Sequence, residues 1–139
     1  MTVFYSDEMT GLYATPVSLP SGGKVDGNVR VKRATITLAS QTTSDTIVIA
    51  KAKAGEEFLY GVITASATLG SSTVAIGIAG ATAKYKAAGT FTTANAPTLF
   101  GTAAGQTTLD ADEEIFVTIG AASLPSSGTL VIDLYFSAT

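Results

Sequence analysis

The chain has 139 residues, of which 46% are hydrophobic and 14% are charged, and its formal net charge is −3. This length fits one domain, and the acidic balance excludes the basic surface typical of nucleic-acid-binding proteins. The sequence has no histidine, cysteine or tryptophan, which excludes histidine general-base catalysis, thiol nucleophiles, disulfides and thiolate metal sites. We therefore expect a protein that is not an enzyme, with no cofactor, no metal and no small-molecule substrate.

The mean hydropathy of +0.38 is high for a soluble monomer. It predicts apolar surface that is covered between subunits of a homo-oligomer. The longest uninterrupted run of apolar residues and glycines, residues 74–81, is far shorter than the roughly 20 residues of a membrane-spanning helix. Residues 1–10 contain Asp7 and Glu8 but no basic residue, so they do not resemble a secretory signal. We expect no membrane partner.

Charge is distributed unevenly along the chain. All eight basic residues precede position 87, whereas residues 88–139 carry five acidic residues and no basic one. Opposite signs suit subunits that pack head to tail or interleave. Two patches that neutralise each other within one domain would explain the same pattern, and both interpretations stay open.

Residues 1–28 are predicted to form an extended N-terminal arm. They contain Pro16, Pro20 and several glycines and show little periodicity, which is typical of a segment without a core of its own. Its large apolar side chains are candidate anchors on a partner, or they fold back onto their own domain: Phe4, Tyr5, Leu12, Tyr13, Val17 and Leu19.

Residues 29–139 are predicted to form a single β-sandwich domain, jelly-roll-like, with about eight strands. β-Branched and aromatic residues recur with period two between glycine, serine and asparagine breaks, and no long window has helical periodicity. The expected strands are residues 29–39, 46–52, 57–69, 74–78, 82–86, 98–100, 114–119 and 128–136. Their number and spacing are those of an all-β sandwich or jelly roll.

The strand expected at residues 57–69 is apolar on both faces. Strict alternation would place Phe58, Tyr60, Val62 and Thr64 on one side. The other side would carry Leu59, Ile63, Ala65 and Ala67. A strand of this kind lies between a core and a second covered surface.

Acidic residues precede two of the expected strands, in residues 55–60 and 112–117. This shared pattern could record a duplication of two four-stranded halves or convergent turn-to-strand punctuation. The densest cluster, Asp110 to Glu114, could hold calcium or form a solvated turn that protects the next strand. Adjacent carboxylates on a strand point to opposite faces, so neither acidic pair can flank one glycosidic bond.

Two basic pairs are candidate partner-binding residues. Arg30 and Lys32 are two positions apart, as are Lys51 and Lys53, so each pair shares one face of its strand. Each pair could meet acidic groups on a partner or keep a strand edge soluble.

About the last hundred residues resemble the head decoration, or cement, proteins of tailed bacteriophages. The resemblance lies in the order of segments 36–39, 46–55, 61–64, 69–80, 84–88, 97–101, 113–119 and 124–130. It implies a jelly-roll-like subunit that forms dimers or trimers on the capsid exterior and clamps neighbouring major capsid proteins. It also implies synthesis in the host cytoplasm without a signal peptide.

Two other functions fit an all-β chain without catalytic residues. One is a carbohydrate-binding module of a spike or adhesin, although sugar platforms usually need exposed aromatic rings and only 8% of this chain is aromatic. The other is a different virion component, in the tail or neck.

Overall fold

The structure is a computed structural model that describes residues 2–20, 22 and 24–138. Its eight strands are β1 (Asn28–Thr37), β2 (Thr46–Ala52), β3 (Glu57–Ala65), β4 (Thr73–Ile78), β5 (Ala81–Thr90), β6 (Thr98–Phe100), β7 (Glu113–Gly120) and β8 (Thr129–Ala138). The four-residue helix α1 (Asp7–Thr10) and the 3-10 turn η1 (Gly11–Tyr13) precede them. Among the described residues, no helix has the length and apolar character needed to cross a bilayer.

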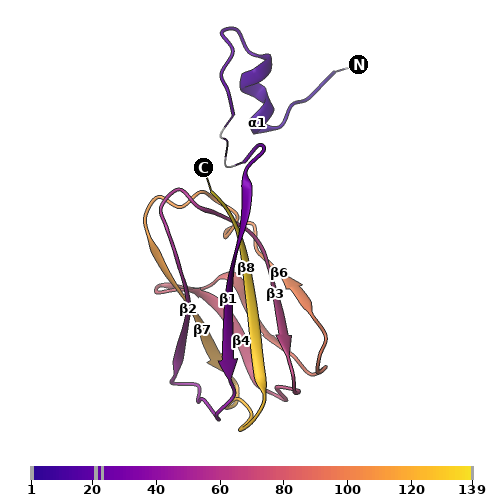
Figure 1. The fold of residues 1–139 in the computed structure, drawn as a ribbon, viewed down its shortest axis with the longest axis vertical. Coiled ribbons are helices and arrows are strands. Elements are labelled where there is room, and N and C mark those ends of the chain that lie inside the picture. Colours follow the sequence, from indigo (N-terminus) through magenta and orange to yellow (C-terminus); the bar gives the residue numbers. More distant parts are fainter. Residues whose placement is uncertain (1, 21, 23, 139) are drawn as a thin grey trace.

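The strands form two four-stranded antiparallel sheets that pack face to face (Figure 1). Sheet I has the order β1-β8-β3-β6, and sheet II has the order β2-β7-β4-β5. The pairs β1–β8, β2–β7, β3–β6 and β4–β5 are each hydrogen-bonded, as when one long hairpin is rolled up. This is the topology of a jelly roll, and the predicted β-sandwich is confirmed.

Alternation along β8 and β7 builds most of the core. Leu130, Ile132, Leu134 and Phe136 all point inward from β8 and are fully buried. They meet a row from β7 in sheet II, Ile115, Val117 and Ile119. Burying such a side chain contributes roughly 1.5–3 kcal/mol, so these two strands supply much of the driving force that closes the sandwich.

The predicted faces of β3 are wrong at its start. The pairing of β3 with β8 shifts register between Phe58 and Tyr60, because Leu59 forms a bulge that inserts one extra residue. Phe58 is therefore fully buried on the same side as Ile63, while Tyr60 points outward and is 42% exposed. The predicted strand also ran too far, since β3 ends at Ala65.

The segment before β1 stands away from the sandwich (Figure 1). It is not extended throughout, because η1 continues directly from α1. The chain then folds back, and the Ser18 N–H donates to the Gly11 carbonyl at 2.8 Å. The rings of Tyr5 and Tyr13 stack with centroids 4.5 Å apart. No residue of α1 or η1 is buried.

Candidate interaction surfaces

The predicted anchors of the arm are mostly open to solvent. Phe4, Tyr5, Tyr13, Val17 and Leu19 are exposed, and Leu12 is half-buried. The accessible surface of 7702 Å² exceeds the roughly 6,700 Å² expected for a compact monomer of this mass. The arm therefore adds apolar surface to the molecule and buries little of it.

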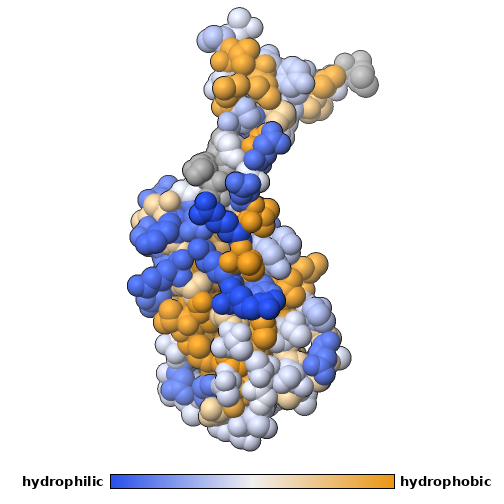
Figure 2. Space-filling view, in the orientation of Figure 1, coloured by the Kyte–Doolittle hydropathy of each residue, from blue (hydrophilic) through white to orange (hydrophobic). Residues whose placement is uncertain are grey.

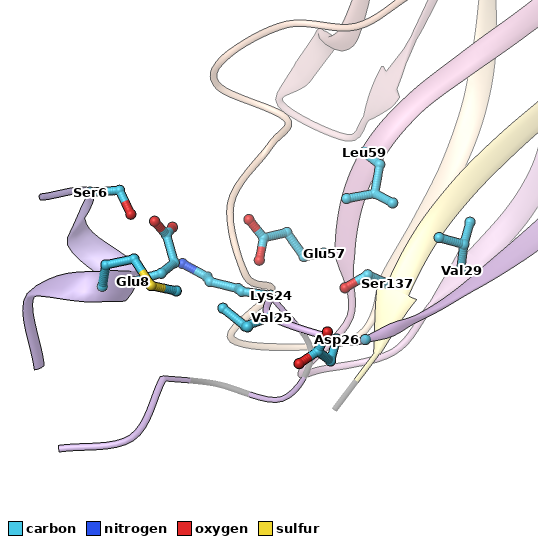
Figure 3. A pocket seen from close by; sticks show the side chains of 11 residues that line it. Ser6, Glu8, Lys24, Val25, Asp26, Val29, Glu57, Leu59 and Ser137 are labelled. Atoms are coloured by element: carbon cyan, nitrogen blue, oxygen red, sulfur yellow. The ribbon is translucent and has the colours of Figure 1, made fainter. Parts of the chain in front are cut away.

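A hollow lies between the arm and the sandwich (Figure 3). It is lined by Glu8 and Lys24 from the arm and by Glu57 and Leu59 from β3. Backbone hydrogen bonding lowers the pKa of Glu8, and the Ser6 hydroxyl and the Lys24 charge lower it further. The hollow thus mixes charged groups with apolar side chains such as Leu59, which makes it a poor binding pocket for an apolar ligand.

The structure gives Lys32 a partner inside the chain. Its ammonium lies 3.2 Å from Oε2 of the buried Glu56 and 5.4 Å from the centre of the Phe136 ring. The other oxygen of Glu56 accepts a hydrogen bond from the Lys53 N–H at 2.8 Å. Arg30 is exposed at the arm end of β1. A partner-binding role for Arg30 and Lys32 stays a prediction.

Lys51 and Lys53 lie at the end of β2 in sheet II, beside acidic residues of the same chain. Lys51 is opposite Glu114 in the β2–β7 register. The Lys53 ammonium lies 3.4 Å from Asp112 in an exposed ion pair, which water and salt screen strongly. Both lysines remain accessible, and their binding to a partner stays a prediction.

The acidic cluster is used for contacts within the domain. Asp112 accepts a hydrogen bond from the Ala54 N–H at 2.9 Å, and this bond, followed by the Lys53 charge, lowers the pKa of Asp112. Glu113 pairs with Lys84 and accepts a hydrogen bond from the Tyr85 hydroxyl at 2.7 Å. Within the part of the chain that the structure describes, no group of three or more acidic side chains could hold a metal ion.

The outer face of sheet I carries an apolar patch. The sequence predicted a second covered surface only along β3, whereas the patch extends over β1 and β6 as well. Within the described residues of the sandwich, the exposed large hydrophobic side chains are Val29, Val31, Val48, Tyr60 and Leu99. All of them except Val48 lie on this face, because their strand neighbours point into the core. Figure 2, drawn from the side of β1 and β8, shows hydrophobic residues on this face and on the arm. The sequence of β1 could have indicated this patch, because Val29 and Val31 alternate with the residues of β1 that point into the core.

Two cross-strand contacts organise this face. The rings of Tyr60 and Tyr135 stack with centroids 4.6 Å apart and nearly parallel planes. One row away, the Arg33 guanidinium forms two hydrogen bonds with the Asp133 carboxylate. Beyond Tyr60, an apolar hollow is lined by Leu99, Phe100 and Gly101.

Comparison with known proteins identifies the fold in several solved structures. No family model matches the sequence, and no curated protein gives a significant match. A chain of the cyanophage Pam1 capsid asymmetric unit is 17% identical, with a TM-score of 0.70 over 94% of this chain and 100% of that chain. A chain of the capsid of Ralstonia phage GP4 is 18% identical, with a TM-score of 0.65 over 96% of each chain. A chain of the acid-stable capsid of Helicobacter pylori bacteriophage KHP30 is 8% identical, with a TM-score of 0.59 over 78% of this chain and 86% of that chain.

Proposed function

We propose that this protein is a virion structural protein, without enzymatic activity, that decorates the outside of a bacteriophage capsid and clamps neighbouring major capsid proteins. The likeness to chains of the Pam1 and GP4 capsids supports this proposal, because it covers nearly the whole of each chain compared. These similar chains come from capsids, which favours the head over the tail or neck.

The observation that carries the clamping role is the apolar arm. Phe4 and Leu19 are each more than four-fifths exposed, on a segment whose helix α1 has only four residues. A helix this short is marginal in water, and large exposed apolar side chains on such a segment are suited to insertion into a partner. The major capsid protein is the partner that this proposal assigns to the arm.

Clamping by an arm gains strength from repetition. Each arm ends in a handful of apolar anchors, so a single contact is weak. An oligomer that places several arms on one capsid converts later contacts into intramolecular ones, and the effective concentration raises the overall affinity without new chemistry. The exposed basic residues of the arm end, Arg30, Lys51 and Lys53, would add salt-sensitive contacts.

Deletion of residues 2–27 tests the arm. Because β1 begins at Asn28 and its ten residues pair with β8, the truncated chain should keep its fold. We expect it to co-sediment much more weakly with capsid shells that lack the protein. Binding as tight as that of the full chain would contradict the proposal.

Point variants make the same test without a deletion. Phe4→Ser and Leu19→Ser remove two exposed anchors of the arm. Val48→Ser removes an apolar side chain that is 54% exposed on sheet II, away from the arm, and is the control. Loss of capsid binding in the control alone would place the contact on the sandwich and not on the arm.

A carbohydrate-binding role has less support from the geometry. Sugar platforms present an open aromatic face, whereas Tyr60 and Tyr135 each cover one face of the other. A glycan array with the intact protein separates the two functions.

A further inference from the structure

We infer that the outer face of sheet I is a self-association surface, on which the same face of a second copy of this chain packs. This inference rests on the proposed function, because an oligomer is what multiplies weak arm contacts. It assigns the two apolar surfaces to different partners: the arm to the capsid, and the sheet face to a second copy.

The charges of this face suit burial against itself. A two-fold interface places the same patch on both sides, so unpaired charges of one sign would meet and repel. Among the described strand residues, the outward positions of sheet I include no lysine, and its central charges, Arg33 and Asp133, already neutralise each other. The remaining acid, Glu57, lies at the arm end.

One row of outward side chains across sheet I has a protruding side chain at one end and a hollow at the other. Val31 is opposite Tyr135, which is opposite Tyr60, and the apolar hollow beside Leu99 and Gly101 follows. A two-fold axis parallel to the strands, between β8 and β3, maps this row onto itself. It sets Val31 of each copy against the hollow of the other and brings the stacked tyrosines together.

The area of the face meets the size that a specific dimer needs. β1 and β8 have ten residues each and β3 has nine. At about 3.4 Å per residue and about 4.8 Å between strands, these three strands cover roughly 500 Å². Two such faces bury about 1,000 Å², which reaches the lower bound for a specific interface. The arm stands beyond the end of the sandwich and leaves this face open (Figure 1).

The mass of the full chain in solution, measured by sedimentation velocity without capsids, tests the inference. We expect twice the chain mass, and Val31→Lys should raise the dissociation constant at least about tenfold, because each copy would bury an ammonium against the hollow of the other. Val48→Lys is the matched control, since Val48 is 54% exposed on sheet II and Val31 is 55% exposed; its mass should not change. A monomer, a trimer, or a dimer that Val31→Lys leaves intact overturns the inference.

Cross-linking provides a second readout that does not depend on a lysine variant folding. The chain has no cysteine, so single cysteines are clean reporters. A mixture of Val31→Cys copies and Leu99→Cys copies should form a mixed disulfide on mild oxidation. A control mixture of Val48→Cys copies and Leu99→Cys copies should not. Equal cross-linking in both mixtures overturns the proposed geometry. Because capsids are absent, these results are independent of whether the arm binds them.

Discussion

Arg33 and Asp133 are 100 residues apart in the sequence and face each other across β1 and β8. Nε of Arg33 donates to Oδ1 of Asp133 at 2.7 Å, and Nη2 donates to Oδ2 at 2.9 Å. The carboxylate is nearly buried while the guanidinium remains largely exposed. Hydrogen bonding to Asp133, and then its negative charge, raises the pKa of Arg33. A bidentate pair of this kind fixes the β1–β8 register, and its two opposite charges neutralise each other on the outer face of sheet I.

Replacement of either partner should destabilise the fold, and the two effects should not add. Arg33→Ala leaves the 7%-exposed Asp133 without its counterion, which is costlier than removing both charges. We expect the double variant, Arg33→Ala with Asp133→Ala, to lose less thermal stability than the two single variants lose together. Differential scanning calorimetry in a Val31→Lys background excludes any effect of self-association. Strict additivity would mean that the pair contributes nothing to the fold.

The alternation of apolar and polar residues along the sequence predicted most of the strands. It failed where the pairing of strands distant in the sequence determines which way a side chain points. The inward row of β8 from Leu130 to Phe136 follows from period two alone. The bulge at Leu59 could not be predicted in the same way, because it is visible only as a register shift against β8. The contact of Lys32 with Glu56 depends likewise on strand order.

The candidate surfaces were predictable to different degrees. The arm was predicted because proline and glycine interrupt any periodicity before residue 29. For the patch on sheet I, the sequence predicted a second covered surface along β3 but not its extension over β1 and β6. Val31 and Leu99 share one face only because β1 and β6 enter the same sheet. Their spacing in the chain carries no sign of that.

Phe58→Ala should be among the most damaging single substitutions. The Phe58 ring is fully buried and contacts the rings of Tyr85, Phe100 and Phe136 at centroid distances of 4.8, 6.2 and 5.6 Å. Removing it leaves a cavity where both sheets meet and should lower the free energy of unfolding by about 3–5 kcal/mol. Urea unfolding measures this loss. Phe4→Ala, on the exposed arm, is the control and should change stability by less than about 0.5 kcal/mol; similar losses in both variants would place the arm in the folded core.

Gly61→Ala should displace β6. A Cβ at this position would lie 2.2 Å from the Phe100 ring, so the ring must move away, and we expect the three-residue strand β6 that carries it to shift as well. Overpacking of this kind costs about 1–3 kcal/mol, and Phe100→Leu should relieve part of it when combined with Gly61→Ala. Gly22→Ala is the control, because a Cβ at that position would have no other atom within 4 Å. A double variant less stable than the sum of the single variants would show that Phe100 is not the obstacle.

Stability should fall at alkaline pH because of Tyr85. Burial, followed by the hydrogen bond to Glu113, raises the pKa of the Tyr85 hydroxyl. In the unfolded chain a tyrosine loses its proton near pH 10, while the folded protein still holds it. The unfolded state then binds fewer protons, so the stabilisation is fully present below about pH 10 and declines as the pH rises above it. Urea unfolding between pH 8 and 11 should show this decline, and Tyr85→Phe should reduce its slope because no proton remains to be lost. Identical slopes for the two proteins would mean that another group, and not Tyr85, controls the alkaline loss.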